Sequence, residues 1–385
     1  MNDTYIINGQ VYIGRSFQNK TIHIRDGKLH LLEPSEAPGP GQVIDAAGQR
    51  VVPGFIDIHT HGAVGVDVNG ASAQDLEKIG RFFAGNGTTA WLASVLTDTE
   101  EQTRWCISQC LAHQKSHGPS AELLGIHLEG PFLAPAYKGA MPEHLLRKGS
   151  AGLAASYQKL AEGNIRYITV SPEVEGVLDM IPALKELGIV AAIGHSGATY
   201  AQAMEAIAAG VSAGTHVGNA MRLLHQHEPA IFGAVLESDV YCEVICDGLH
   251  LHPGTVRLLL KTKGTSRLVA ITDSIMAAGL PDGNYHLGVN QVVVVNGDAK
   301  LASDGTRAGS TLTQDRALRN LLAFTGLPLE ELLPVLTENP ARLIGVFDRK
   351  GSIAEGKDAD LVVLDAQNRV AGVFLRGERL QREPS

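Results

Sequence analysis

Short apolar runs alternate with helix-like stretches through the middle of the chain. The apolar runs show little alternation of polar and apolar residues, which is typical of strands buried on both faces, as in a parallel sheet. The strand-like runs are residues 51–62, 88–95, 123–130, 165–172, 189–196, 212–219, 240–250 and 267–274. The helix-like stretches include residues 73–86, 101–115, 174–187, 199–208 and 253–262. Eight strand–helix units predict an α/β fold of the (β/α)8 type, a TIM-like barrel.

Both ends of the chain have a different, β-rich pattern. Asn8-Gly9 and Asp26-Gly27 each separate two β-rich runs, which predicts hairpin turns. Residues 350–385 contain two further runs of this kind, DADLVVLD and RVAGVFLRGERL. Two β-rich ends that flank a different middle predict a small β-sandwich domain built from both termini.

The pattern therefore divides the chain into two predicted domains. Residues 1–52 and 348–385 form the small β domain, and residues 53–347 form the barrel. Residues 284–301 resemble a hairpin inserted after the eighth strand, and helices follow through about residue 346.

Polar side chains stand where the predicted strands end. The first strand ends in a histidine pair, and the third, fifth, sixth and eighth strands each end in one polar residue: His59, His61, Glu129, His195, His216 and Asp273. The carboxyl ends of barrel strands converge on one mouth, where active sites of such barrels lie. These residues, far apart in the sequence, are therefore predicted to meet.

The residue types in this set suit a divalent metal. His59 and His61 are two residues apart, so their side chains share one face of a strand. Asp273 adds a carboxylate, and Glu129 could bridge to a second ion held by the other two histidines. Nitrogen and oxygen donors suit Zn²⁺, Fe²⁺, Co²⁺ or Ni²⁺ better than Ca²⁺ or Mg²⁺. We predict one or two divalent ions, with zinc as the first choice.

Each of these residues alone also has an ordinary explanation. A lone HxH pair can be solvated, a lone histidine after an apolar run is more often structural than a ligand, and Glu129 can cap the following segment. All of them together at the ends of predicted strands would leave several buried polar groups unpaired, which costs several kcal/mol. The joint arrangement therefore favours a metal site.

Composition and charge exclude some functions. The chain is 44% hydrophobic and 19% charged, with a net charge of −9 and no basic stripe, so nucleic-acid binding is not expected. The sequence starts without a secretory pattern, and no apolar run approaches the ~20 residues that span a bilayer. The four cysteines show neither zinc-site nor secreted-framework spacing. These features predict a cytoplasmic protein that does not bind membranes.

Several motifs carry a resemblance to a known family. PGFIDIHTHG, GHS, THVGNAM, ITDS and GSIAEGKDADLVVLD, together with HLEGPF and DGLH, look like the N-acetylglucosamine-6-phosphate deacetylases of the amidohydrolase superfamily. The resemblance covers essentially the whole chain, and HLEGPF, GNAM and DGLH are its more specific parts.

The resemblance implies a metal-bound water that attacks an acetamide carbonyl and releases acetate from an amino-sugar phosphate. It implies that Glu129, His195 and His216 hold the principal ion, and that His59 and His61 help to hold a second one. Asp273 would act as the catalytic base and then as the acid that protonates the departing amine. A homodimer is the family expectation.

The sequence departs from the family pattern at two places. Met141, after Ala140, stands where related sequences carry a histidine that contacts the substrate, and methionine cannot donate a hydrogen bond. His227 stands where related sequences have an arginine that reaches the sugar phosphate of a neighbouring subunit, and histidine lacks its bidentate geometry. Phosphate binding would then fall to His250 and to the backbone of Asn219 and Ala220, with Arg222 or His225 as weaker candidates.

Three functions therefore stay open at this stage. The first is deacetylation of N-acetylglucosamine-6-phosphate or N-acetylgalactosamine-6-phosphate. The second is hydrolysis of another N-acyl sugar, an N-acyl amino acid, a dipeptide or a cyclic amide, which Met141 and His227 keep open. The third is a barrel retained as a scaffold or binding protein, against which the complete set of ligands and base argues.

Overall fold

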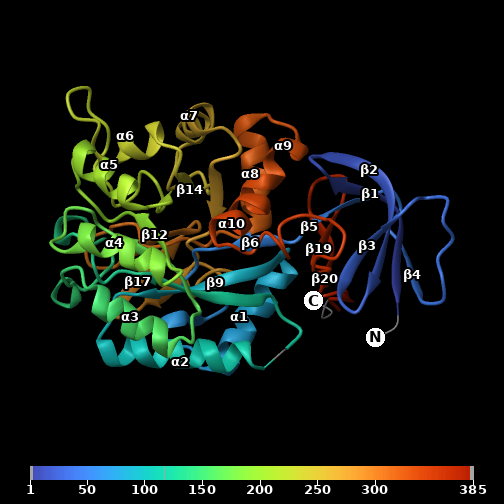
Figure 1. Ribbon diagram of the computed structural model, residues 1–385, viewed down its shortest axis with the longest axis horizontal. Coiled ribbons are helices and arrows are strands. Elements are labelled where there is room, and N and C mark those ends of the chain that lie inside the picture. The colour runs from blue at the N-terminus through green and yellow to red at the C-terminus, as the bar shows by residue number, and fades with distance from the viewer. Residues whose placement is uncertain (1–2, 117, 382–385) are drawn as a thin grey trace.

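A barrel of eight parallel strands forms the centre of the protein, and helices surround it (Figure 1). The computed structural model describes residues 3–116 and 118–381. In spatial order the barrel strands are β6 (Phe55–Asp57), β9 (Thr88–Leu96), β10 (Glu122–Glu129), β11 (Ile165–Val170), β12 (Val190–Ile193), β13 (Ala213–Gly214), β14 (Tyr241–Ile245) and β15 (Leu268–Ile271). Their residues are almost all buried, which explains the apolar runs without alternation. The predicted TIM-like barrel is confirmed.

The barrel closes between its first and last strands through a side chain and loop backbone instead of a regular strand pair. Thr272 donates a hydrogen bond through Oγ1 to Oδ2 of Asp57 at 2.6 Å. Just beyond, the N–H of Asp273 donates to the carbonyl of His59 at 2.9 Å. Asp57 is fully buried, and burial raises the pKa of its carboxyl group to about 6. This seam fixes His59 and Asp273 relative to each other.

Helices cover the outside of the barrel, and local sequence sets where several of them begin. They are α1 (Ala73–Gly85), α2 (Glu100–Gln114), α3 (Ala151–Leu160), α4 (Val177–Glu186), α5 (Tyr200–Ala209), α6 (Ala230–Glu237), α7 (Pro253–Lys263), α8 (Gln314–Thr325), α9 (Leu329–Leu336) and α10 (Glu338–Leu343). Ser72 with Asp75, and Thr199 with Gln202, form capping boxes that start α1 and α5. Short 3-10 turns lie at 68–70, 135–137 and 143–145.

Strands from both ends of the chain form a second sheet beside the barrel, at the right of Figure 1. Its strands are β1 (Thr4–Ile13), β2 (Ser16–Arg25), β3 (Lys28–Leu32), β4 (Gln42–Asp45), β5 (Arg50–Pro53), β19 (Leu361–Leu364), β20 (Val370–Leu375) and β21 (Glu378–Arg379). The two ends join where β5 pairs with β19, antiparallel, from Pro53–Leu361 to Arg50–Leu364. The fold class is therefore an α/β barrel with an additional sheet from the termini, as predicted.

One of the two predicted hairpin turns is wrong. Asp26 and Gly27 do form the turn between β2 and β3, with positive φ values of 50° and 73°. Asn8 and Gly9, in contrast, lie inside the continuous strand β1, where the pairing register with β2 shifts. Because of this bulge, β1 pairs with β4 before Asn8-Gly9 and with β5 after it. The Asn-Gly pair therefore forms a bend within one strand instead of a turn between two strands.

After the eighth strand the chain forms a small antiparallel sheet of three strands. They are β16 (Gly283–Leu287), β17 (Asn290–Val295) and β18 (Asp298–Leu301), where the sequence suggested a hairpin. Val292 and Val294 are buried while Val293 and Val295 are exposed, the alternation of a sheet with one covered face. A further pair, β7 (Gly62–Ala63) and β8 (Val66–Asp67), follows the first barrel strand.

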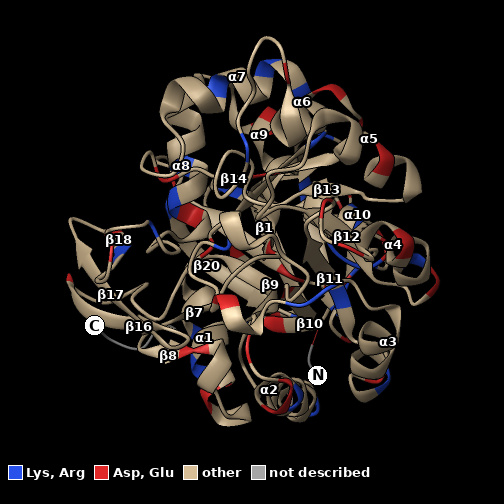
Figure 2. Ribbon diagram, turned by 90° about the vertical axis from the view of Figure 1, so that its left-hand side faces the viewer, with Lys and Arg blue, Asp and Glu red and all other residues tan. Residues whose placement is uncertain are grey.

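Charged residues of both signs lie interspersed on the helices in the view of Figure 2. Within residues 3–116 and 118–381, no helix has the length and apolar character needed to cross a membrane.

A buried lysine joins the barrel to the terminal sheet. Lys350 is 2% exposed at its side chain and contacts three carboxylates: Glu122 at the start of β10 at 2.8 Å, Asp358 at 3.2 Å, and Asp360. Burial alone would lower the pKa of Lys350, but the negative charges of Asp360 and Glu122 outweigh it and raise the pKa. The ammonium group therefore stays charged among carboxylates that need it.

We expect Lys350→Ala to lower the free energy of unfolding by roughly 3–5 kcal/mol, because it leaves the buried carboxylate of Asp360 without the ammonium group that contacts it. Urea unfolding followed by circular dichroism measures the change. Lys148→Ala is the matched control: its pair with Glu175 is 73% and 74% exposed, so a change within about 0.5 kcal/mol is expected. Equal effects of the two substitutions would contradict the role of Lys350.

Candidate metal centre

Six side chains from five barrel strands meet at the mouth formed by the carboxyl ends of the strands. They follow or end β6, β10, β12, β13 and β15: His59, His61, Glu129, His195, His216 and Asp273. All six residues are at most 8% exposed. The structure thus brings together the complete set that the sequence pointed to.

Glu129 lies at the centre of this group. Its Oε1 is 3.0 Å from Nε2 of His195 and 3.1 Å from Nε2 of His216. Its Oε2 is 3.2 Å from Nε2 of His61, and Oε1 is 3.4 Å from Nε2 of His59. Burial alone would raise the pKa of Glu129, but the charge of His59 and the hydrogen bond from His195 lower it well below its usual range. One carboxylate therefore faces imidazoles from three strands.

Asp273 stands at the edge of the same group. Its Oδ1 is 3.3 Å from Nε2 of His61 and 3.6 Å from Nε2 of His59. Burial raises the pKa of Asp273, but the hydrogen bond from His61 and the charges of both histidines outweigh it and lower the pKa. Its side chain is 12% exposed, so it also faces the opening of the barrel.

The donor atoms fit a divalent ion. Two ligand atoms that each lie about 2.0–2.1 Å from one tetrahedral ion are about 3.4 Å apart. The Nε2 atoms of His59 and His61 are 3.3 Å apart, and those of His195 and His216 are 3.1 Å apart. At the barrel mouth, two groups of three residues bring all their ligand atoms within 4.8 Å of one another: His59, Glu129 and His216, and His59, His61 and Asp273. These groups share His59, and the donor set is the nitrogen and oxygen mixture that zinc and its neighbours accept.

Three of the six residues hold backbone conformations that side chains rarely adopt. The φ angles of His195, His216 and Asp273 are 47°, 27° and 49°. Non-glycine residues in this region cost about 1–3 kcal/mol each and cluster at functional sites. Each of these conformations lies two residues after a barrel strand ends, at the point where the side chains converge.

Hydrogen bonds behind the histidines set which ring nitrogen faces the centre. Nδ1 of His61 is 3.1 Å from the carbonyl of Ser94, and Nδ1 of His195 is 2.8 Å from the carbonyl of Tyr137. A carbonyl only accepts, so Nδ1 keeps a proton in each ring, and Nε2 offers a lone pair to an ion once its own proton has left. This is the usual outer support of a metal-bound histidine.

The family model described as "Amidohydrolase family" matches residues 50–380. The chain belongs to the amidohydrolase family. Enzymes of this family depend on metal ions, which agrees with the donor set at the barrel mouth.

Several named deacetylases are similar to this chain over almost its whole length. The N-acetylglucosamine-6-phosphate deacetylase of Bacillus subtilis (strain 168) is 38% identical over 370 residues, covering 94% of this chain and 92% of the relative. The N-acetylgalactosamine-6-phosphate deacetylase of Escherichia coli O157:H7 is 34% identical, with 93% of each chain covered. The crystal structure of N-acetylglucosamine-6-phosphate deacetylase from Pasteurella multocida matches with a TM-score of 0.93 and 31% identity, over 99% of this chain and 100% of that one.

The predicted substrate-binding residues of this amidohydrolase lie on loops around the mouth. Asn219 donates through Nδ2 to the carbonyl of His216 at 3.1 Å, and Ala220 accepts at its carbonyl from the N–H of Ser196 at 3.0 Å. His250 follows β14, with Nδ1 2.6 Å from Oδ2 of Asp247. Asn219 and Ala220 thus adjoin the ligands directly, whereas His250 has its own carboxylate partner.

The other three predicted substrate-binding residues, His227, Met141 and Ala140, have different surroundings. His227 is exposed on the loop before α6, where its ring lies 5.3 Å from that of His225. Met141 is 2% exposed and belongs to an apolar cluster with Leu133 and Leu287. Ala140, beside it, accepts at its carbonyl from the side chain of Asn290 at 2.7 Å. The loop that carries Ala140 and Met141 is thus held by the small three-stranded sheet.

Sequence reasoning missed Glu243, on β14. Oε2 of its carboxylate is 3.2 Å from Nδ1 of His59, and both side chains are fully buried. The available signal was a charged residue inside a run that otherwise reads as a buried strand, YCEVIC. His127, also buried, packs with its ring 4.5 Å from that of His59 and was missed in the same way.

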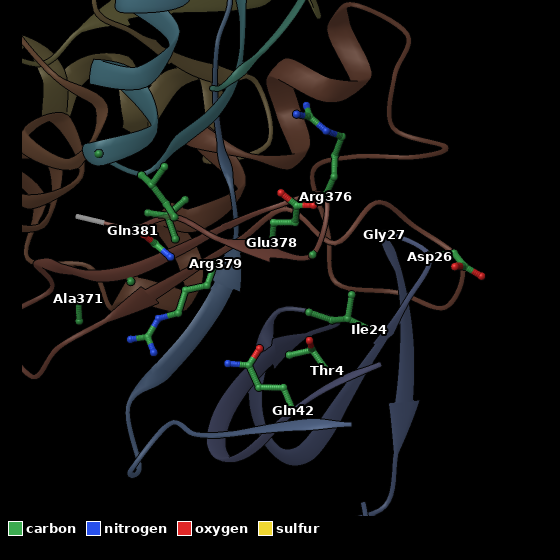
Figure 3. A pocket seen from close by; sticks show the side chains of 15 residues that line it. Thr4, Ile24, Asp26, Gly27, Gln42, Ala371, Arg376, Glu378, Arg379 and Gln381 are labelled. Atoms are coloured by element: carbon green, nitrogen blue, oxygen red, sulfur yellow. The ribbon is translucent and has the colours of Figure 1, made fainter. Parts of the chain in front are cut away.

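A hollow of about 800 Å³ lies elsewhere in this amidohydrolase, in the terminal sheet (Figure 3). Thr4, Ile24 and Gln42 line one part of it, and residues 371–373 and 376–381 line another. None of the six residues at the barrel mouth lines this hollow. Its size therefore has no bearing on the metal chemistry.

We expect Glu129→Gln to weaken binding of divalent metal by at least about 100-fold, more than the ~10- to 100-fold typical of a lost outer partner. The amide removes the negative charge that balances the ion and the facing imidazoles. Metal content after dialysis, measured by plasma mass spectrometry, reports the loss. Glu237→Gln, on an exposed pair with Tyr200, should keep the wild-type metal content. Equal metal in Glu129→Gln and wild type would remove Glu129 from the site.

Proposed function

We propose that this amidohydrolase hydrolyses the N-acetyl group of an amino-sugar 6-phosphate, N-acetylglucosamine-6-phosphate or N-acetylgalactosamine-6-phosphate, to the amino-sugar phosphate and acetate. The relatives named for these two reactions span almost the whole chain at 38% and 34% identity. The observation that carries the proposal is the carboxylate of Asp273 beside a cluster of four histidines and Glu129. This arrangement places a base next to a set of metal ligands.

The residues at the mouth divide into ligands and base. Glu129, His195 and His216 would hold the principal ion, and His59 and His61 would hold a second one, with the carboxylate of Asp273 beside them. We take zinc as the first choice, with iron, cobalt or nickel as alternatives that accept the same donors. When bound, the ion lowers the pKa of water toward ~7 and polarises the amide carbonyl.

Asp273 then moves the proton. Its lowered pKa keeps the carboxylate ionised at neutral pH, so it accepts a proton from the attacking water. It delivers that proton to the amide nitrogen, because an amine leaves poorly unless it is protonated. The backbone of Asp273 is fixed by its N–H bond to His59 and by the N–H of Ser310, which donates to its carbonyl at 2.7 Å. The carboxylate is therefore held in place for both transfers.

Substrate contacts come from the surrounding loops. Asn219 and the backbone of Ala220 adjoin His216, and His250 is oriented by Asp247, so these groups serve the sugar and its phosphate. His227 is exposed on a protruding loop with Leu223 and Leu224, which are 60% and 53% exposed. We propose that this loop packs against a second copy of the chain in a homodimer and brings His227 toward that copy's phosphate. A monomer by light scattering would remove this part of the proposal.

A second candidate is hydrolysis of another amide, such as a different N-acyl sugar, an N-acyl amino acid, a dipeptide or a cyclic amide. Two observations favour keeping it. Met141 is buried in an apolar cluster and gives the substrate no hydrogen-bond donor. His227 cannot form the bidentate hydrogen bonds with which an arginine would bind phosphate.

We place the enzyme in the cytoplasm, where its four buried cysteines, all free, stay reduced.

A substrate panel tests the proposal. We expect kcat/KM for N-acetylglucosamine-6-phosphate or its galactosamine epimer to exceed that of the unphosphorylated sugar by about 10- to 100-fold, the value of one charge-assisted hydrogen bond. Acetate release is measured after reconstitution with Zn²⁺, Co²⁺, Fe²⁺ or Ni²⁺. If both phosphorylated sugars are inert while another amide turns over well, the second candidate replaces the first.

We expect Asp273→Asn to lower kcat by about 100- to 10,000-fold, because the amide can neither accept nor return the proton. The principal ion should remain bound, since its ligands are untouched. Steady-state kinetics and metal analysis of the same sample separate the two effects. Asp304→Asn, on an exposed loop, should leave kcat unchanged. Wild-type kcat in Asp273→Asn would refute the assigned role.

A further inference from the structure

Glu243 lies on β14, the strand between β13 and β15 in the barrel. The two flanking strands are each followed by one of the six residues at the mouth, whereas β14 carries none of them. It is completely buried, and a buried carboxylate is costly unless hydrogen-bonded or paired. Its neighbours on the strand, Cys242 and Val244, are buried apolar residues. The carboxyl group of Glu243 therefore needs specific hydrogen-bond partners at this position.

Glu243 has two such hydrogen-bond partners, His59 and His216. Oε2 of Glu243 accepts from Nδ1 of His59 at 3.2 Å and from the backbone N–H of His216 at 3.0 Å. The carbonyl of Glu243 accepts from the next N–H, that of Val217, at 3.0 Å. Glu243 thus holds two successive N–H groups at the point where the chain turns through the strained φ of 27° at His216.

The hydrogen bond between Glu243 and His59 also determines which ring nitrogen of His59 carries the hydrogen. The same Oε2 of Glu243 already accepts the backbone N–H of His216, so it also acts as an acceptor toward Nδ1 of His59. Nδ1 then carries a hydrogen, and in the neutral ring Nε2 carries the lone pair. Nε2 is the atom that lies 3.3 Å from Nε2 of His61 and 3.4 Å from Glu129. At the barrel mouth, His59 belongs to both groups of three residues that could hold an ion. One carboxylate therefore orients the ligand that the two groups share.

We infer that Glu243 is a positioning residue of the metal centre, which fixes the tautomer of His59 and the strained turn at His216 and thereby sets the affinity for divalent metal. The inference rests on the proposed function, because it takes the six residues at the mouth as ligands and base. It assigns to β14 a part in the metal centre through a residue that touches neither ion nor substrate.

The test uses two substitutions of different severity in the full-length protein. Glu243→Ala removes both bonds and the charge, whereas Glu243→Gln keeps an oxygen that can accept both bonds but removes the charge. Zn²⁺ affinity is measured by competition with a chelator, and the ligand field by visible absorption of bound Co²⁺. We expect Glu243→Ala to bind Zn²⁺ roughly 10- to 100-fold more weakly and to alter the Co²⁺ spectrum. Glu243→Gln should fall between Glu243→Ala and wild type.

Glu122→Gln is the matched control. It makes the same carboxylate-to-amide change on β10 at the opposite end of that strand from Glu129, where Glu122 pairs with Lys350. It should lower the free energy of unfolding without changing Zn²⁺ affinity or the Co²⁺ spectrum. A general loss of stability therefore cannot mimic the effect expected at Glu243.

The outcomes separate the two proposals. If wild type binds no divalent ion, the metal centre itself fails. If wild type binds Zn²⁺ and both Glu243 variants bind it within about twofold of wild type with an unchanged Co²⁺ spectrum, the positioning role of Glu243 is overturned while the proposed function stands. If Glu243→Ala does not fold, Glu243→Gln decides: weaker Zn²⁺ binding supports the role, and wild-type binding refutes it.

Discussion

The carboxylate of Glu129 is the contact on which the rest of the site depends. It faces imidazoles from three different strands within 3.0–3.4 Å, and its side chain is 4% exposed. Bringing this many polar groups out of water is unfavourable unless each has a partner, and divalent cations are partners that both carboxylate oxygens and imidazole nitrogens can bind. The other features of the barrel mouth keep this convergence in place.

Three kinds of constraint act on the converging side chains. The seam at Asp57 and Thr272 joins the strands that carry the histidine pair and Asp273. Left-handed backbone at His195 and His216 lies at the point where their side chains converge. Carbonyls hold the outer ring nitrogens of His61 and His195, and Glu243 holds that of His59. The six converging residues end or directly follow barrel strands, whereas His227 and Met141 lie on loops, the segments that vary most readily between related proteins.

Sequence patterns predicted the barrel and the convergence because both depend on local features. A strand buried on both faces leaves an unbroken apolar run, and the residue that follows it, such as His195 or Glu129, marks the mouth. The rest depended on contacts between distant residues. Glu243 looked like an isolated charge until the fold brought it to His59, and Asn8-Gly9 has the same local preference for a turn as for a bulge. Burial of Met141 required the small sheet around β17, whose third strand the sequence did not reveal.

The terminal sheet has a consequence for synthesis of the chain. The edge of β5 pairs with β19 between Pro53 and Leu361, so its partner emerges roughly 300 residues later. At 5–20 residues per second, the ribosome needs about 15 to 60 seconds to deliver it. During that interval the nascent protein carries an open strand edge, the kind of surface that aggregates, and the barrel in between is complete before this edge is covered.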